Sequence, residues 1–260
     1  MTQLQALLWD VDGTLAETER DGHRVAFNLA FEACGLPWRW DVARYGELLR
    51  ITGGRERLLH DMKTQRDAPV LDDERNALVA RLHQLKNQRY AEILRDSGIP
   101  LRAGVLNVMQ QCLDRGVRMG ITTTTSRTNV DALLRIHLGA KWEQWFSVLV
   151  CGEDVQRKKP DPEVYLRALQ TLSIGPLACV AIEDSPGGVA AACAAHIPVV
   201  VTLSAYFNSA TIEGAVAIGP GLHDRRNWRP GLRASADDTG VELDDIEAWC
   251  AQMDTISQYG

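Results

Sequence analysis

The sequence has 260 residues, of which 45% are hydrophobic and 24% are charged, as is typical of a globular protein that buries a core. It contains 34 Asp and Glu residues against 28 Lys and Arg, which gives a formal net charge of −6. This balance argues against a nucleic-acid-binding surface and against a polybasic membrane anchor.

The first predicted element is an apolar strand over residues 6–11, which presents Asp10 and Asp12 just before Gly13. Two carboxylates this close repel each other when both are ionised, so the pair indicates a nearby cation, most simply a divalent metal. The glycine stands too early in the loop for a calcium-binding EF-hand. One carboxylate could attack an electrophilic phosphorus while the other moves a proton, and the alternative is a pair of solvated turn residues.

Residues 16–98 interrupt the strand pattern and favour an all-helical segment. The stretch "TERD", which starts at Thr18, is typical of a helix-capping box. Apolar residues then recur at helical spacing, first over residues 27–34 and later over residues 78–94. Because loops of this length are rare, we expect a helical cap inserted after the first strand.

Short apolar strands alternate with amphipathic helices along the rest of the chain. Strands that are apolar throughout and are each followed by a helix indicate a parallel sheet covered on both faces. The predicted fold is α/β: a doubly wound, Rossmann-like parallel sheet as the core, residues 1–15 and 99–260, and an all-helical cap domain, residues 16–98. Ligands of such sheets lie at the C-terminal ends of the strands. The later predicted strands are 117–122, 147–151, 178–182, 198–201 and 215–218, and the helices lie near 104–115, 126–138, 162–172 and 186–196.

Three further polar motifs follow predicted strands. The stretch "TTTTSRTN" contains Thr123 and Thr124 and precedes a helix whose free backbone N–H groups could bind a phosphate oxygen. The stretch "RKKPDPEVY" sets Lys159 directly before a proline, and "CVAIEDSPGG" ends a strand with Glu183 and Asp184. Taken alone, these are more often an N-cap, a solvated lysine pair and capping acids. Together they bring hydroxyls, a cation and carboxylates to one sheet edge, as phosphoryl transfer requires.

In that order the motifs resemble motifs one to four of the haloacid dehalogenase-like hydrolases, over residues 6 to 202. The resemblance implies that Asp10 is the nucleophile and Asp12 the general acid/base. It also implies that Thr123 hydrogen-bonds the phosphoryl group and that Lys159 neutralises its charge. An aspartate at position 12 is what the phosphotransferring members show, so the target is phosphorus. The implied Mg²⁺ ligands are Asp10, Asp12 through its backbone carbonyl, Asp184, and Glu183 directly or through water.

The inserted helices resemble the cap of the subfamily that contains β-phosphoglucomutase and many sugar-phosphate phosphatases. There the cap closes over the core, excludes water and contacts the substrate. By this resemblance, Arg55 in "RITGGRER" binds the non-transferring phosphate and Lys86 has a similar task. Each of these residues could instead be an ordinary surface residue. The expected substrate-binding residues are Glu17, His23, Arg55, Lys86 and Thr124.

Several stretches, among them "DGTLAETE" and "AFNLAFEACGL", resemble the bacterial Calvin-cycle phosphatases that remove a phosphate from xylulose 1,5-bisphosphate. We therefore expect a Mg²⁺-dependent phosphatase that acts on a small sugar bisphosphate through an aspartyl-phosphate. Trp9 departs from the phenylalanine that is usual before the first acid. The alternatives are a β-phosphoglucomutase-type sugar phosphomutase, a phosphatase for another sugar phosphate or phosphoglycolate, and a non-catalytic binding protein.

The tail after residue 203 has little in common with this family. Its arginines at 225, 226, 229 and 233 alternate with acids and favour a solvated loop before a final helix. Six cysteines without a CxxC pair favour reduced thiols, and no window approaches about 18 apolar residues. We expect a cytoplasmic monomer whose partner is a small phosphorylated sugar, without a nucleic-acid or membrane partner.

Overall fold

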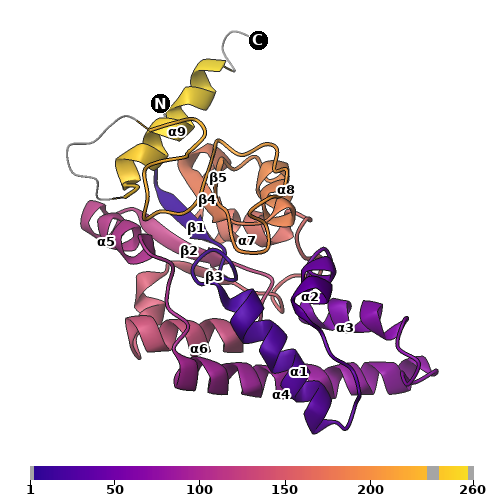
Figure 1. Ribbon diagram of the computed structural model, residues 1–260. Helices are drawn as coiled ribbons and strands as arrows, with labels where there is room; N and C mark the ends of the chain where they lie inside the picture. Colours follow the sequence, from indigo (N-terminus) through magenta and orange to yellow (C-terminus); the bar gives the residue numbers. More distant parts are fainter. Residues whose placement is uncertain (1–2, 233–239, 257–260) are drawn as a thin grey trace.

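The computed structural model describes residues 3–232 and 240–256, and a six-stranded sheet forms its centre (Figure 1). The strand order is β3-β2-β1-β4-β5-β6, and all neighbouring strands are parallel. This is the doubly wound order, so the predicted fold class is confirmed. The bounds are β1 Ala6–Trp9, β2 Arg118–Thr122, β3 Val148–Val150, β4 Cys179–Glu183, β5 Val199–Thr202 and β6 Ala217–Gly219.

Helices cover both faces of the sheet because successive residues of each strand point to opposite faces and both sets are apolar. Leu7, Trp9 and Ile182 pack with α5, α6 and α9, whereas Leu8 and Ala181 pack with α7 and α8. None of the helices within the described ranges combines the length and apolar composition that a bilayer crossing requires. The bounds are α5 Val105–Arg115, α6 Arg127–Leu138, η2 Trp142–Trp145, α7 Glu163–Leu172, η3 Pro176–Ala178, α8 Pro186–Ala194 and α9 Leu243–Ile256.

Between β1 and α5 the described chain forms helices, and α4 runs alongside both α1 and α6 (Figure 1). The two short helices α2 and α3 were not predicted, because seven to nine residues show too few periods to be recognised. They close a separate apolar cluster in which Tyr45 and Leu58 contact Phe27 and its neighbours. The cap boundaries, residues 16–98, stay a prediction. The bounds are η1 Glu19–His23, a π-helical turn, α1 Arg24–Ala33, α2 Val42–Leu48, α3 Gly54–Met62 and α4 Asp72–Ser97.

The predicted capping box at Thr18 is wrong. Thr18 itself has helical backbone angles, φ −81° and ψ −17°, and its side chain caps no backbone N–H. Its buried hydroxyl instead donates to Asp12 Oδ1 at 2.5 Å. The hydroxyl that the sequence pattern assigned to a helix cap therefore binds a carboxylate at the edge of the sheet.

The segment after β6 is packed in part and solvated in part. Trp228 is buried and stacks on Trp249 of α9, with 4.6 Å between the ring centroids. Arg225 pairs with Asp245 of the same helix. Arg226, by contrast, pairs with Asp224 of the same loop, and both Arg226 and Arg229 are exposed, as predicted. Helix α9 is the predicted final helix; position 233 lies outside the described residues.

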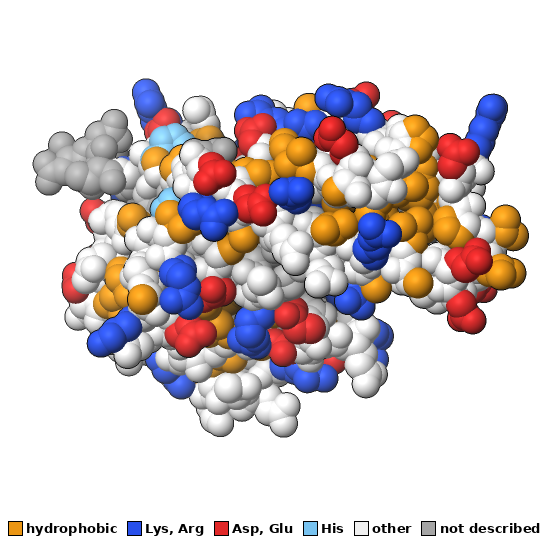
Figure 2. All heavy atoms as spheres, turned by 90° about the horizontal axis from the view of Figure 1, so that it is seen from below, with side chains coloured by type: hydrophobic (Ala, Val, Ile, Leu, Met, Phe, Trp, Pro, Cys, Tyr) orange, Lys and Arg blue, Asp and Glu red, His pale blue; other side chains and the backbone are white. Residues whose placement is uncertain are grey.

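Charges of both signs are interspersed over the face of the molecule seen from below (Figure 2). No continuous basic stripe runs across that face. This distribution agrees with the net charge of −6. The expectation that nucleic acid is not the ligand stays a prediction.

Candidate active site

The register of the sheet brings three site strands to the same level. The last residue of β1 pairs with the fourth residue of both β2 and β4. The residues that follow, Asp10, Thr122 and Glu183, therefore lie side by side at the C-terminal ends of the strands. This is the edge at which parallel sheets of this type bind ligands.

Lys159 reaches this edge from the loop between β3 and α7. Its Nζ lies 2.7 Å from Asp10 Oδ1 and 2.6 Å from Glu183 Oε1, and it donates to the Thr122 carbonyl at 2.8 Å. Burial acts to lower the pKa of Lys159, but the two carboxylates outweigh burial and raise that pKa above its ordinary value. A permanently charged ammonium thus contacts the proposed nucleophile.

The three acids at the edge carry more negative charge than Lys159 can balance. Asp10, Glu183 and Asp184 each place a carboxylate oxygen within 4.8 Å of the others, and all three are buried. Burial raises the pKa of Asp10 to about 7 against the effect of Lys159, and burial with the neighbouring Asp10 raises that of Asp184 well above its ordinary value. The cluster therefore requires a further positive charge.

The donors of this cluster fit a divalent cation. Carboxylate oxygens are the ligands that hard cations such as Mg²⁺ prefer. Gly13, at φ +88°, lets the backbone approach closely, since a Cβ there would lie 2.1 Å from Asp184 Oδ2. Glu183 Oε2 is buried without a hydrogen-bond partner in the described part of the chain, which leaves one acceptor of the cluster unused.

Asp12 turns toward the cap instead of toward this cluster. It accepts a hydrogen bond from Thr18, and His23 Nε2 lies 2.8 Å from its Oδ1. Burial acts to raise the pKa of Asp12, but His23 and Thr18 outweigh burial and lower it to about 2. His23 itself is buried and stacks on Tyr90, so the structure places it behind Asp12 as a support for that carboxylate.

The two threonines predicted from "TTTTSRTN" follow β2 directly. The Thr123 N–H donates to the Val150 carbonyl at 3.0 Å, and its hydroxyl accepts from the Thr125 N–H at 3.2 Å. Thr123 is thereby held one residue beyond the level of Asp10, and α6 begins four residues later. Thr124 is half-buried and lies nearer to the cap.

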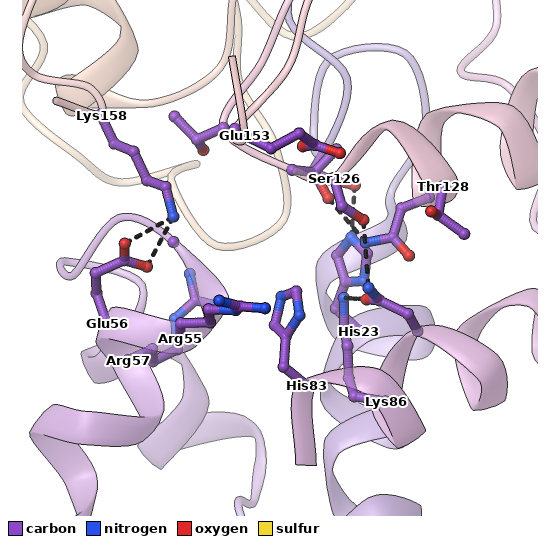
Figure 3. A pocket seen from close by; sticks show the side chains of 18 of the residues that line it. His23, Arg55, Glu56, Arg57, His83, Lys86, Ser126, Thr128, Glu153 and Lys158 are labelled. Atoms are coloured by element: carbon purple, nitrogen blue, oxygen red, sulfur yellow. Dashed lines mark hydrogen bonds and ion pairs between the residues drawn. The ribbon is translucent and has the colours of Figure 1, made fainter. Parts of the chain in front are cut away.

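Two cavities meet between the sheet edge and the cap. The core cavity, about 300 Å³, is lined by Asp10, Glu17, Thr123, Lys159 and Asp184, among others. The cap cavity, about 450 Å³, is lined by His23, Arg55, His83, Lys86 and Lys158, among others (Figure 3). Both cavities share five lining residues, which we call the waist: Asp12, Glu19, Gly53, Arg57 and Thr124.

Outside the waist, the cap cavity is lined by the cations Arg55, Lys86 and Lys158 and by the acids Glu56 and Glu153. Arg55 of α3 projects into it beside His83 and forms no ion pair or hydrogen bond with the residues described, whereas Lys158 pairs with Glu56 at 2.7 Å (Figure 3). Burial lowers the pKa of Lys86 to about 8, although Asp12 acts in the opposite direction. Burial, and then the cations Lys86 and Arg55, lower the pKa of His83 to about 3. Burial is the largest cause of both shifts, and Arg55 is a cation of this cavity that an anionic ligand could pair with.

Glu17, which was predicted to bind substrate, contacts the loop that follows β5. Its carboxylate accepts from the Ala205 N–H at 3.2 Å and lies 3.6 Å from Arg102 Nε. Glu19, Arg57 and Tyr165 line or support the site and were not predicted. Tyr165 donates to Glu183, and no local pattern marks any of the three, since each gains its position only from packing between separate elements.

Comparisons with known proteins agree with this geometry. The model of the haloacid dehalogenase-like hydrolase family matches residues 4–196. Protein CbbY of Rhodobacter capsulatus is 42% identical over 242 residues, which are 93% of this chain and 99% of that protein. The phosphorylated carbohydrates phosphatase of Thermotoga maritima is 31% identical over 195 residues, 75% of this chain and 82% of that protein.

A solved structure is also similar. The crystal structure of a CbbY mutant from Rhodobacter sphaeroides in complex with xylulose 1,5-bisphosphate matches with a TM-score of 0.79 at 36% identity. The match covers 84% of this chain and 95% of that chain. The family resemblance inferred from the sequence motifs is therefore confirmed.

Proposed function

We propose that this chain, which belongs to the haloacid dehalogenase-like hydrolase family, is a Mg²⁺-dependent phosphatase of a small sugar bisphosphate, with xylulose 1,5-bisphosphate as the expected substrate. The observation that carries the proposal is the pair of cavities that meet at the waist, one with the acidic cluster and Lys159, the other with Arg55. A bisphosphate would place one phosphate at Asp10 and the other beside Arg55. The bisphosphate named for the similar CbbY structure supports this assignment.

In the proposed reaction Asp10 attacks the phosphorus, the bond to the sugar oxygen breaks, and an aspartyl-phosphate forms. Asp12 gives a proton to the departing sugar oxygen, and its proton affinity rises when the dianionic phosphate binds. Lys159, 2.7 Å from Asp10, compensates the charge of the transferred group, and Thr123 hydrogen-bonds it.

In the second step water hydrolyses the aspartyl-phosphate and Asp12 takes up its proton. His23 and Thr18 hold the Asp12 carboxylate ionised for that role. Mg²⁺, held by Asp10, Asp184, Glu183 and the Asp12 carbonyl, would supply the positive charge that the acidic cluster lacks. The cap excludes bulk water from the reacting atoms.

Phosphate release from a substrate panel tests the proposal. The panel comprises xylulose and ribulose 1,5-bisphosphates, phosphoglycolate and hexose phosphates, each with Mg²⁺. We expect the highest kcat/KM for a ketopentose bisphosphate. A preference for phosphoglycolate would overturn the bisphosphate assignment, and conversion of β-glucose 1-phosphate to glucose 6-phosphate would identify a phosphomutase instead.

The expected monomer stays a prediction. The cytoplasmic location also stays a prediction. Sedimentation of the purified protein checks the first of these expectations.

A further inference from the structure

Among the residues described, only those of the waist line both cavities. The carbon chain of a bisphosphate that spans both cavities must therefore pass the waist. Two of its five residues, Asp12 and Glu19, are carboxylates. With Arg57 the five residues carry a formal charge of −1, which disfavours a phosphate at this point and leaves the waist to an uncharged part of the ligand. The polar groups that remain unpaired there determine which uncharged part fits.

Glu19 offers an acceptor at the waist. Its Oε2 accepts a hydrogen bond from the Tyr45 hydroxyl at 2.5 Å and lies 4.0 Å from Arg57 Nη1. Its Oε1 has no hydrogen-bond partner among residues 3–232 and 240–256, and 19% of the side chain is exposed. One oxygen of the Glu19 carboxylate is thus held by Tyr45, and the other is available to a ligand.

Arg57 offers a donor beside it. Arg57 is 6% exposed, its Nε donates to the Leu48 carbonyl at 3.2 Å, and its Nη1 donates to the Tyr45 hydroxyl at 2.8 Å. The guanidinium also lies over the Tyr45 ring at 5.0 Å, while its Nη2 has no partner in the part of the chain that the structure describes. Helix α3 and the π-helical turn η1 thus present a fixed donor and a fixed acceptor to the same space.

We propose that Glu19 and Arg57 recognise a hydroxyl group on the carbon chain between the two phosphates, and so select sugar bisphosphates over plain alkyl bisphosphates. An alcohol can donate to Glu19 Oε1 and accept from Arg57 Nη2. A methylene group leaves both unpaired, which a site built for hydrogen bonds rejects. This inference rests on the proposed function, because it requires a ligand with two phosphates.

Binding to the Asp10→Asn protein tests the inference without turnover. Calorimetry with Mg²⁺ would compare xylulose 1,5-bisphosphate with pentane-1,5-diol bisphosphate, which lacks the hydroxyl and carbonyl groups. We expect the sugar bisphosphate to bind at least about tenfold more tightly. Added Glu19→Ala should reduce that ratio to about threefold or less, mainly by weakening the sugar complex.

Two further variants separate recognition from a purely structural role. Glu32→Ala removes an exposed glutamate of α1 and should leave the ratio unchanged. Glu19→Gln keeps the volume and one acceptor oxygen, so its ratio should fall between those of the parent and of Glu19→Ala. It also provides the test if Glu19→Ala does not fold.

The inference is overturned if the Glu19 variants keep the full ratio, or if they weaken both ligands equally. Phosphate release by the wild-type enzyme reports separately on the proposed function. Xylulose 1,5-bisphosphate that binds selectively without being hydrolysed would overturn that function and leave the inference standing. Failure of both bisphosphates to bind would overturn both.

Discussion

The core cavity is lined by more acids than cations, whereas the part of the cap cavity outside the waist is lined by more cations than acids. At the sheet edge, three buried carboxylates face Lys159, and burial with mutual repulsion raises the pKa values of Asp10 and Asp184. Around the cap cavity, burial lowers the pKa values of Lys86 and His83; nearby cations add to the shift of His83, whereas Asp12 and Glu19 oppose that of Lys86. Buried charge without a partner costs free energy, so each imbalance marks the place of a ligand of opposite sign.

A balanced ion pair elsewhere in the cap shows the difference. Asp61 is buried, but it accepts hydrogen bonds from Trp40 at 2.7 Å and from Arg44 at 2.6 Å. Burial acts to raise the pKa of Asp61, and these donors outweigh burial and lower it. Such a group stabilises the folded chain and needs no ligand, unlike the groups that line the two cavities.

The largest effect is expected at the core cavity. Asp10→Asn removes the proposed nucleophile and should lower kcat by at least about 10³-fold, because no neighbouring group replaces it. Steady-state phosphate release measures the loss. A variant that retains more than about a tenth of the wild-type kcat would contradict the assignment of Asp10.

Removal of the divalent cation should show directly whether the acidic cluster needs a further positive charge. Chelation should abolish phosphate release, and Mg²⁺ at about 100 times its Kd should stabilise the folded protein by about 2.7 kcal/mol. Thermal unfolding with and without Mg²⁺ measures this, with Asp184→Asn as the variant that loses most of the shift. Equal shifts in wild type and variant would place the cation elsewhere.

The cap cavity should respond to substrate charge. Arg55→Ala should lower kcat/KM for the bisphosphate by about 10- to 100-fold, chiefly through KM, since it removes a charged donor from the second phosphate. A monophosphate should be affected less. Arg39→Ala, an exposed cap arginine outside both cavities, is the matched control. Equal losses of kcat/KM for the monophosphate and the bisphosphate would contradict the proposal that the two cavities bind different phosphates.

The smallest effect concerns acid stability. The pKa of His83 is about 3 in the folded chain against an ordinary value near 6.5, so the unfolded chain binds more protons in this window. The contribution of His83 is complete above pH 6.5 and is lost as the pH falls toward 3. His83→Gln should therefore flatten the decline in the free energy of unfolding between pH 7 and pH 4. Urea unfolding measures this free energy, and equal declines in the wild type and the variant would show that His83 is not the cause.

The sequence by itself predicted the six strands, the helices of the core and the strand ends that carry Asp10, Thr123 and Asp184. These predictions succeed because apolar periodicity and turn residues are local properties of the chain. The parallel arrangement then brings the strand ends together, since every strand of the sheet ends at the same edge.

Only the tertiary structure decided how the cap completes the site. The hydrogen bond of Thr18 to Asp12, the support of that carboxylate by His23, and the waist at Glu19 and Arg57 each join residues from different elements. The direction of such side chains depends on how helices pack against one another and against the sheet. No local pattern encodes that packing. The cap residues His23, Arg55 and Lys86 were expected from a family resemblance, but their contacts, and the roles of Glu19 and Arg57, follow only from the fold.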